Sequence, residues 1–92
     1  EIASVVADGE LLHFTTQNNK KFVINYRLKD LEARLKPELF IRLSRSALVR
    51  FNLIQKVIPQ TGGNFEVFLK NGQHFNVSRS RSRIFRESFL KF

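Results

Sequence analysis

The chain has 92 residues, enough for one modest hydrophobic core, and 42% of them are apolar. It lacks cysteine, which excludes disulfides and thiolate metal sites, and no apolar run reaches the roughly 18 residues that a membrane-spanning helix needs. Sixteen Lys and Arg against eight Asp and Glu give a net charge of +8. All of this excess lies beyond residue 40, because residues 1–40 hold six bases and six acids whereas residues 41–92 hold ten and two. We therefore expect a polyanionic partner, since each phosphate that is neutralised releases a counterion.

The first part of the chain reads as an antiparallel meander followed by a helix. Short segments at residues 2–7, 10–16 and 21–25 predict three strands, with the tight-turn dipeptide Asp8-Gly9 between the first two. Leu28, Leu31 and Leu35 then have the spacing of one helix face. This stripe predicts a short helix over about residues 27–36 that covers one side of the sheet. Pro37 is expected to end it, because the residue before a proline is disfavoured in the α conformation.

The second part returns to extended segments and closes with a helix. Residues 40–43 and 47–51 predict two strands, and residues 53–58, 65–70 and 73–77 predict three more, the last two joined by the hairpin dipeptide Asn71-Gly72. An amphipathic helix is expected over about residues 80–91, with Ser78 or Ser80 as its cap. The residues expected on its apolar face are Ile84, Phe85, Ser88, Phe89 and Phe92.

Catalytic motifs find little support. His13 and His74 are the only histidines, and each is read as a surface or strand residue. The sequence has no GxSxG turn, no glycine-rich phosphate loop and no acidic spacing typical of a metal site. We therefore expect no enzyme, no metal and no cofactor.

Basic residues alternate with serines in two places. Residues 79–83 alternate Arg and Ser, which offer phosphates a charged fork of donors and a short hydroxyl donor. On a helix Arg79 and Arg83 would share a face, while Arg81 would point about 160° away from Arg79, so one base reader flanked by phosphate clamps is one possible arrangement. The alternative is a solvated basic face. Ser44, Arg45 and Ser46 repeat this chemistry in a break between strands.

A third candidate tip is the turn at Asp8, Gly9 and Glu10. Its carboxylates would have to accept from a cytosine amino group or stay clear of phosphate. An ordinary hairpin turn explains the same residues at least as well.

Residues 40–54 resemble the signature stretch of the LytTR DNA-binding domain, which is found in LytR/AlgR-type bacterial response regulators. The hairpin at residues 69–73 and the segment that follows it, residues 76–79, resemble a second signature, and the likeness covers essentially the whole chain. Three positions depart from the family pattern. Ser44 replaces the usual His, Arg50 the usual Asn, and Asn76 a common Pro. Ser44 shortens the reach of its loop, and Arg50 adds a charge whose direction the sequence leaves open.

The resemblance implies a mostly β fold, an elongated arrangement of short antiparallel sheets with short helices. It also implies that loop residues, and not an inserted recognition helix, enter successive major grooves. Arg79, at the end of the last strand, is then the expected base reader. The expected backbone clamps are Ser44, Arg45, Ser46, Ser80, Arg81 and Arg83, with Gly9 and Glu10 near a third contact.

The same resemblance implies the biological setting. We expect sequence-specific binding to double-stranded DNA by the output domain of a cytoplasmic two-component transcriptional regulator, with two copies on paired repeats. A receiver or sensor domain would lie elsewhere in the chain, a histidine kinase would act on the full-length protein, and this domain would not contact a membrane. Residues 1–92, which begin at Glu1 without Met, are expected to be a single domain from the C-terminal end of a larger regulator.

Two other function classes stay open. One is an RNA-binding β domain that stacks bases on exposed rings, for which Phe68 and Tyr26 are the candidates. The other is a module for anionic lipid or phosphopeptide that uses the terminal basic helix.

Overall fold

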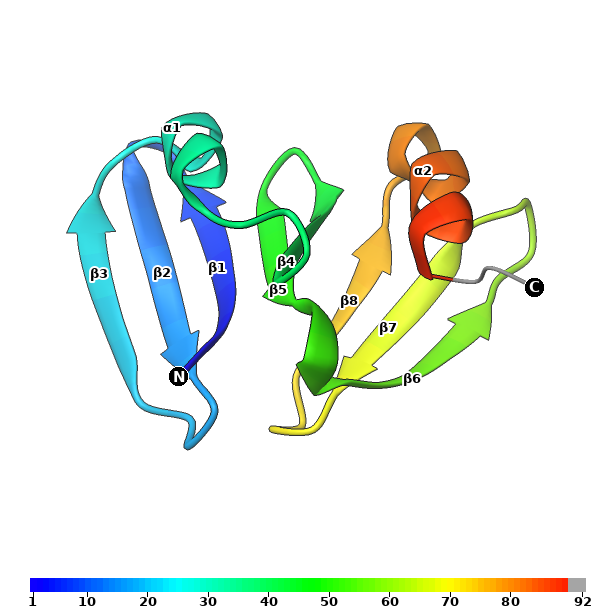
Figure 1. The fold of residues 1–92 in the computed structure, drawn as a ribbon, viewed down its shortest axis with the longest axis horizontal. Helices are drawn as coiled ribbons and strands as arrows, with labels where there is room; N and C mark the ends of the chain where they lie inside the picture. The colour runs from blue at the N-terminus through cyan, green and yellow to red at the C-terminus, as the bar shows by residue number, and fades with distance from the viewer. Residues whose placement is uncertain (90–92) are drawn as a thin grey trace.

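The computed structural model describes residues 1–89 and consists of two antiparallel sheets with a helix beside each (Figure 1). The first sheet has the strand order β3-β2-β1-β5-β4, and the second has the order β6-β7-β8. The domain measures 36 × 25 × 23 Å along its principal axes and is therefore elongated in one direction. The elements of the first sheet and its helix are β1 (Ile2–Asp8), β2 (Leu11–Thr16), β3 (Lys21–Asn25), α1 (Leu28–Arg34), β4 (Phe40–Ser44) and β5 (Ala47–Arg50). A 3-10 turn, η1 (Phe51–Leu53), leads to β6 (Ile54–Pro59), β7 (Phe65–Leu69), β8 (His74–Val77) and α2 (Arg79–Phe89).

The expected fold class is confirmed, and the differences lie at element boundaries. α1 ends at Arg34, because Leu35 is already extended, with φ −91° and ψ 152°. The strands expected at residues 47–51 and 53–58 are separated by η1, which takes up Phe51 and Leu53. α2 begins at Arg79 and not at residue 80. The part of that helix expected beyond residue 89, with Phe92, lies outside the described residues.

Two hydrophobic clusters hold the fold together. The smaller one lies under α1, where Leu28 packs with Leu12 and Leu48, so this helix does cover one side of the first sheet. The larger one joins both sheets and α2, and includes Leu43, Val67 and Phe85. Because this cluster contains residues of both sheets, the two sheets share one hydrophobic core.

The apolar face expected for α2 is wrong at Ile84 and at Ser88. The Ile84 side chain is 53% exposed and Ser88 is also exposed, whereas Phe85 is 1% exposed and Ser82 is buried. Ser82 and Phe85 are three residues apart and share the face that packs on the second sheet, which turns Ile84 to solvent. The hydroxyl of Ser82 is satisfied, since it donates to the carbonyl of Ser78 at 2.9 Å.

The hairpin predicted from Asn71-Gly72 is confirmed as the link between β7 and β8. The amide of Gly72 donates to the carbonyl of Leu69 at 3.0 Å, and the amide of Leu69 donates to the carbonyl of Gln73 at 2.8 Å. Gly72 has a φ of 94°, which side chains with a Cβ rarely adopt. This is the geometry of a three-residue loop that ends in a left-handed glycine.

Polar side chains join the two sheets on the edge where this hairpin lies. The Ser4 hydroxyl, fully buried in β1, donates to Oε1 of Gln73 at 2.7 Å. Asn71 Nδ2 donates to the same oxygen at 2.9 Å, and Asn19 Nδ2 donates to the Asn71 carbonyl at 3.1 Å. The end of the second sheet is therefore fixed to β1 and to the turn after β2.

Candidate nucleic-acid interface

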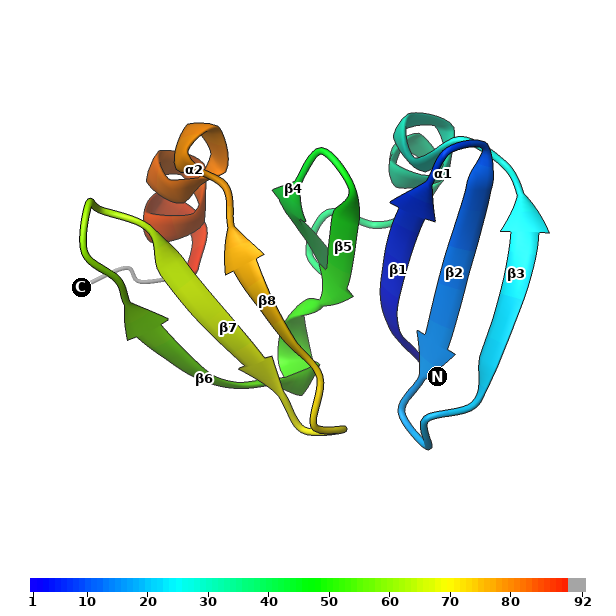
Figure 2. The same cartoon turned by 180° about the vertical axis from the view of Figure 1, so that it is seen from behind.

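The three segments expected to meet DNA lie along one edge of the molecule. The β1–β2 turn, the β4–β5 turn and the start of α2 all stand at the upper edge in both views (Figures 1 and 2). The row follows the longest axis of the domain, which measures 36 Å. Two backbone hydrogen bonds of 2.8 Å tie it together, from the Ala7 amide to the Ser46 carbonyl and from the Ser78 amide to the Leu43 carbonyl. Segments far apart in sequence thus form one continuous edge.

The β4–β5 turn has its carbonyls directed into the protein. The carbonyls of Ser44 and Arg45 accept hydrogen bonds of 2.7 Å from Nε and Nη2 of Arg42. The neighbouring carbonyls of Leu43 and Ser46 accept from the amides just described. Four consecutive carbonyls therefore have protein donors, and the Arg45 and Ser46 side chains are exposed. Such a turn presents side-chain donors, and not carbonyl oxygens, to an anion.

Ser44, which replaces the usual family histidine, lies within the turn. Its hydroxyl accepts from the Ser46 amide at 3.2 Å and lies 3.4 Å from the Ser46 hydroxyl. The side chain is half-buried. Ser44 thus shapes the turn by a local side-chain to backbone bond, a common use of serine.

The start of α2 carries the second basic segment. Arg79 and Ser80 are exposed in its first turn, so the expectation that Arg79 ends a strand is wrong: β8 stops at Val77. Arg81 is half-buried on the other flank of the helix. Arg83 is exposed and forms an ion pair of 3.5 Å with Glu87, one turn further on.

Two groups can be distinguished among five arginines of the basic half. Arg42 pairs with Glu32, and Arg50 donates to the Ile2 carbonyl at 2.7 Å and lies 4.6 Å from the centre of the Phe40 ring. The open question of Arg50 is thereby answered, since its guanidinium serves the packing of the first sheet. By contrast, the side chains of three arginines at the candidate edge make no hydrogen bond or ion pair within residues 1–89. They are Arg45, Arg79 and Arg81.

The β1–β2 turn contributes the third tip. Gly9 has a φ of 63°, and Glu10 is exposed beside it. Asp8 lies 3.9 Å from Nε2 of His13, within a largely exposed pair. This turn is the acidic part of the edge.

The described residues form neither a candidate metal site nor a candidate membrane-spanning helix. Residues 1–89 contain no group of three His, Asp or Glu side chains that could hold a metal ion. His74 pairs with Glu66 at 3.0 Å and stacks on Phe68, so both histidines lie on the surface as expected. Neither helix within residues 1–89 combines the length and the apolar character that a bilayer crossing requires.

The rings proposed for base stacking are largely occupied. Phe68 is half-buried, with His74 stacked at 5.5 Å and Lys56 Nζ 4.8 Å from its centre. Tyr26 packs against the cluster under α1. Phe22, which no sequence pattern singled out, is 43% exposed but stacks on Phe14 at 4.9 Å.

Arg42 holds the β4–β5 turn by contacts that the sequence did not reveal. It alternates with Ile41 and Leu43 in β4 and therefore looks like an ordinary solvent-facing cation. Its partner Glu32 belongs to α1, ten residues earlier, and no spacing rule connects the two.

Comparisons with known proteins agree with this arrangement. The family model of the LytTr DNA-binding domain matches residues 1–90. The LytTr DNA-binding domain of a Bacillus cereus protein, described as a methyl-accepting/DNA response regulator, superposes with a TM-score of 0.88 and 27% identity, over 99% of this chain and 82% of that one. Two regulators of Staphylococcus aureus, from strains NCTC 8325 and COL, are 36% identical over 62 residues, which are 67% of this chain.

The chain spans only 42% of the length of these curated relatives, which are called uncharacterized HTH-type transcriptional regulators. Within residues 1–89 the two helices are separated by five strands and do not form a helix-turn-helix. The sequence match, the superposition and the two signature segments agree with one another. The chain belongs to the LytTR family of DNA-binding domains.

Proposed function

We propose that this domain binds double-stranded DNA in a sequence-specific manner, with the turns and the helix start of its long edge reaching into major grooves. The observation that carries the proposal is the single row formed by the three segments, tied by the Ala7 and Ser78 amides. The domain is 36 Å long, and one turn of B-DNA advances about 34 Å. A row that runs along this axis can therefore extend across neighbouring grooves.

The roles proposed for the side chains follow from their freedom and position. Arg79 is exposed in the first turn of α2, where its fork can reach a guanine edge. Arg81 lies on the opposite flank and Arg83 lies one turn along, which suits contacts to phosphates on either side. Arg83 must exchange Glu87 for a phosphate, a small cost because exposed ion pairs contribute only about 0.2–1 kcal/mol. Ser80 provides a further hydroxyl beside them.

The β4–β5 turn is proposed as the second backbone grip. Arg45 is exposed and unpaired among the described residues, and the Ser46 hydroxyl stands beside it. Ser44 uses its lone pair within the turn, but its hydroxyl hydrogen can still be donated to a phosphate oxygen. Gly9 and Glu10 form the third contact, where the Glu10 carboxylate can accept from a cytosine amino group.

The wider setting is also a proposal. We infer that the domain is the C-terminal output part of a bacterial two-component regulator that acts in the cytoplasm. A receiver or sensor domain elsewhere in the protein, and a histidine kinase acting on it, would control the binding of two copies to paired repeats. The Bacillus cereus neighbour, described as a response regulator, supports this context.

The test begins with a duplex selected from a random library, because the target sequence is unknown. Binding of Arg79→Ala is then measured by fluorescence anisotropy on the selected duplex and on a scrambled one. Loss of a bidentate contact to guanine should weaken cognate binding by about 1–3 kcal/mol and leave the scrambled duplex nearly unaffected. Equal losses on both duplexes would contradict a base-reading role for Arg79.

Two further sets of variants separate phosphate contacts from base contacts. Arg81→Ala and Arg83→Ala should weaken binding to both duplexes and lower the salt slope by about one unit each. Lys70→Ala is the matched control, since it removes an exposed charge at the opposite edge, beside the β7–β8 turn (Figure 1). A preference for single-stranded RNA, or binding to anionic vesicles without duplex affinity, would favour the other two function classes.

A further inference from the structure

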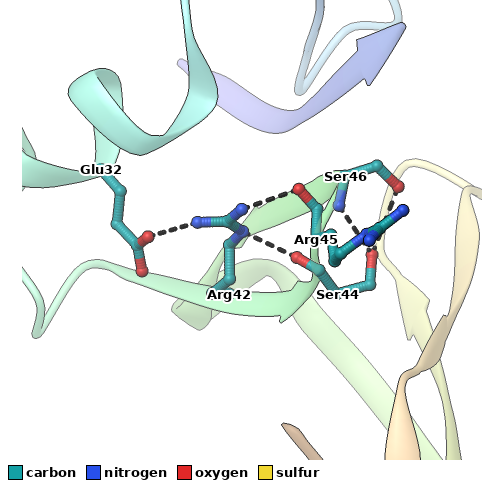
Figure 3. Close-up of polar contacts among 5 residues, drawn as sticks. All are labelled: Glu32, Arg42, Ser44, Arg45 and Ser46. Atoms are coloured by element: carbon teal, nitrogen blue, oxygen red, sulfur yellow. Dashed lines mark hydrogen bonds and ion pairs between the residues drawn. The ribbon is translucent and has the colours of Figure 1, made fainter. Parts of the chain in front are cut away.

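Arg42 lies beneath the β4–β5 turn and uses all three nitrogens of its guanidinium there. Its side chain is 11% exposed although it carries a full charge. Nε and Nη2 donate to the Ser44 and Arg45 carbonyls at 2.7 Å each, and Nη1 binds the Glu32 carboxylate (Figure 3). A buried charge is tolerated when it is paired in this way. Each nitrogen of the Arg42 guanidinium therefore has a protein acceptor, and the side chain offers little exposed surface to a phosphate.

The two carbonyls that Arg42 binds belong to adjacent peptides at the tip of the turn. A carbonyl oxygen facing a phosphate would repel it, and a carbonyl without a partner would turn toward water. Because the guanidinium is a planar fork, one side chain can bind both oxygens and keep them directed inward. The exposed surface of the turn is then left to the Arg45 guanidinium and the Ser46 hydroxyl.

Glu32 completes the arrangement from α1. Its carboxylate takes the third nitrogen and neutralises the charge of Arg42, so the unpaired positive charge of the turn is that of Arg45. Glu32 is held by a helix whose Leu28 and Leu31 pack into the cluster of the first sheet. The orientation of the turn is thereby connected to a packed element and not only to its own strands.

From these contacts we propose that Arg42 and Glu32 are a positioning pair, which holds the β4–β5 turn in its DNA-binding conformation before DNA arrives. Neither residue contacts DNA in this assignment. The inference rests on the proposed contact of the turn with the DNA backbone. It adds that the affinity of that contact depends on a preformed turn.

The first measurement compares Arg42→Gln with wild type on cognate and scrambled duplexes over a range of salt concentrations. Because the variant leaves the side chains of the turn to be ordered on binding, cognate affinity should fall on the order of tenfold. The salt slope should not change, because no ion pair with phosphate is lost. A slope lower by about one would identify Arg42 as a phosphate contact and overturn the proposal.

A second measurement needs no DNA. The amides of Ala7 and Ser78 donate to the Ser46 and Leu43 carbonyls, which flank the two held by Arg42. Loosening the turn in Arg42→Gln should therefore speed hydrogen exchange at Ala7 and Ser78, while the amides of the central strand β7 keep their protection. Unchanged exchange rates at Ala7 and Ser78 would overturn the positioning role, whatever the change in DNA affinity.

Variants of the turn separate this proposal from the proposed function. If Arg45→Ala leaves DNA affinity intact, the turn does not grip DNA, and both proposals fail at this segment. If Arg45→Ala weakens binding, Arg42→Gln should add little in that background, since both act through the same contact. Additive losses would show that Arg42 acts elsewhere and would overturn the inference.

Two conservative variants test the chemistry of the pair. Arg42→Lys keeps the charge but lacks the planar fork, so it should remain closer to Arg42→Gln than to wild type. Full recovery by Lys would contradict the claim that the fork is needed. Glu32→Gln keeps an acceptor without charge and should speed exchange at Ala7 and Ser78 less than Arg42→Gln does. If Glu32→Gln shows the same exchange rates at Ala7 and Ser78 as wild type, Glu32 has no part in positioning the turn.

Discussion

Gln73 provides the sharpest test of how the two sheets are joined. The hydroxyl of Ser4, 0% exposed, donates to Oε1 of Gln73 at 2.7 Å. Gln73→Leu keeps most of the volume but removes this acceptor, so a buried donor loses the partner that the structure gives it. An unsatisfied buried polar group costs about 1–3 kcal/mol. In a domain of this size each kcal/mol lowers the Tm by about 4–8 °C.

The assay is urea unfolding followed by circular dichroism, with wild type, Gln73→Leu, Ser4→Ala and the double variant. Removing the Ser4 hydroxyl as well leaves no buried donor at position 4 without its acceptor, so the double variant should be more stable than Gln73→Leu alone. Gln60→Leu is the matched control, because its one long hydrogen bond of 3.4 Å lies on the surface. Strictly additive losses in the double variant, or a loss at Gln73 no larger than at Gln60, would refute the reasoning.

Two further predictions concern stability. Phe85→Ala should cost about 3–5 kcal/mol, because its ring is 1% exposed where α2 meets the second sheet; a loss below 1 kcal/mol in the same urea assay would show that this helix adds little to the core. Gly72→Ala should cost about 1–2 kcal/mol from its φ of 94° alone, since no atom beyond its two chain neighbours lies within 4 Å of the added Cβ; an unchanged Tm would mean that the loop can adopt another turn.

Local patterns predicted the elements of this fold well. The spacing of Leu28 and Leu31 depends only on neighbouring residues of one helix, and Asn71-Gly72 is a hairpin signal over two residues. The helix and the hairpin were confirmed because the interactions that decide them join residues close in sequence. The length of α1 was overestimated, since Leu35 already has an extended conformation.

The candidate site depends on contacts between residues that are far apart in the sequence. The basic segments could be recognised from composition, but their common edge follows from bonds such as Ser78 to Leu43. The roles of Arg42 and Arg50 were hidden for the same reason, because a strand arginine looks alike whether it faces water or a distant carboxylate. Ile84 was misplaced because helical spacing shows which residues share a face but not which face packs against the rest of the protein.

The hydrophobic cluster that spans both sheets has a consequence for the DNA. Leu43 lies beside the β4–β5 turn and Phe85 lies in α2, and both belong to this cluster together with Val67 of β7. The span between the two basic grips can change only if the cluster opens. In the proposed binding mode, a duplex whose groove spacing differs from that span must therefore bend or twist to fit, at an energy set by the stiffness of its own base steps. Base pairs that no side chain touches would then be part of what the domain recognises in that mode.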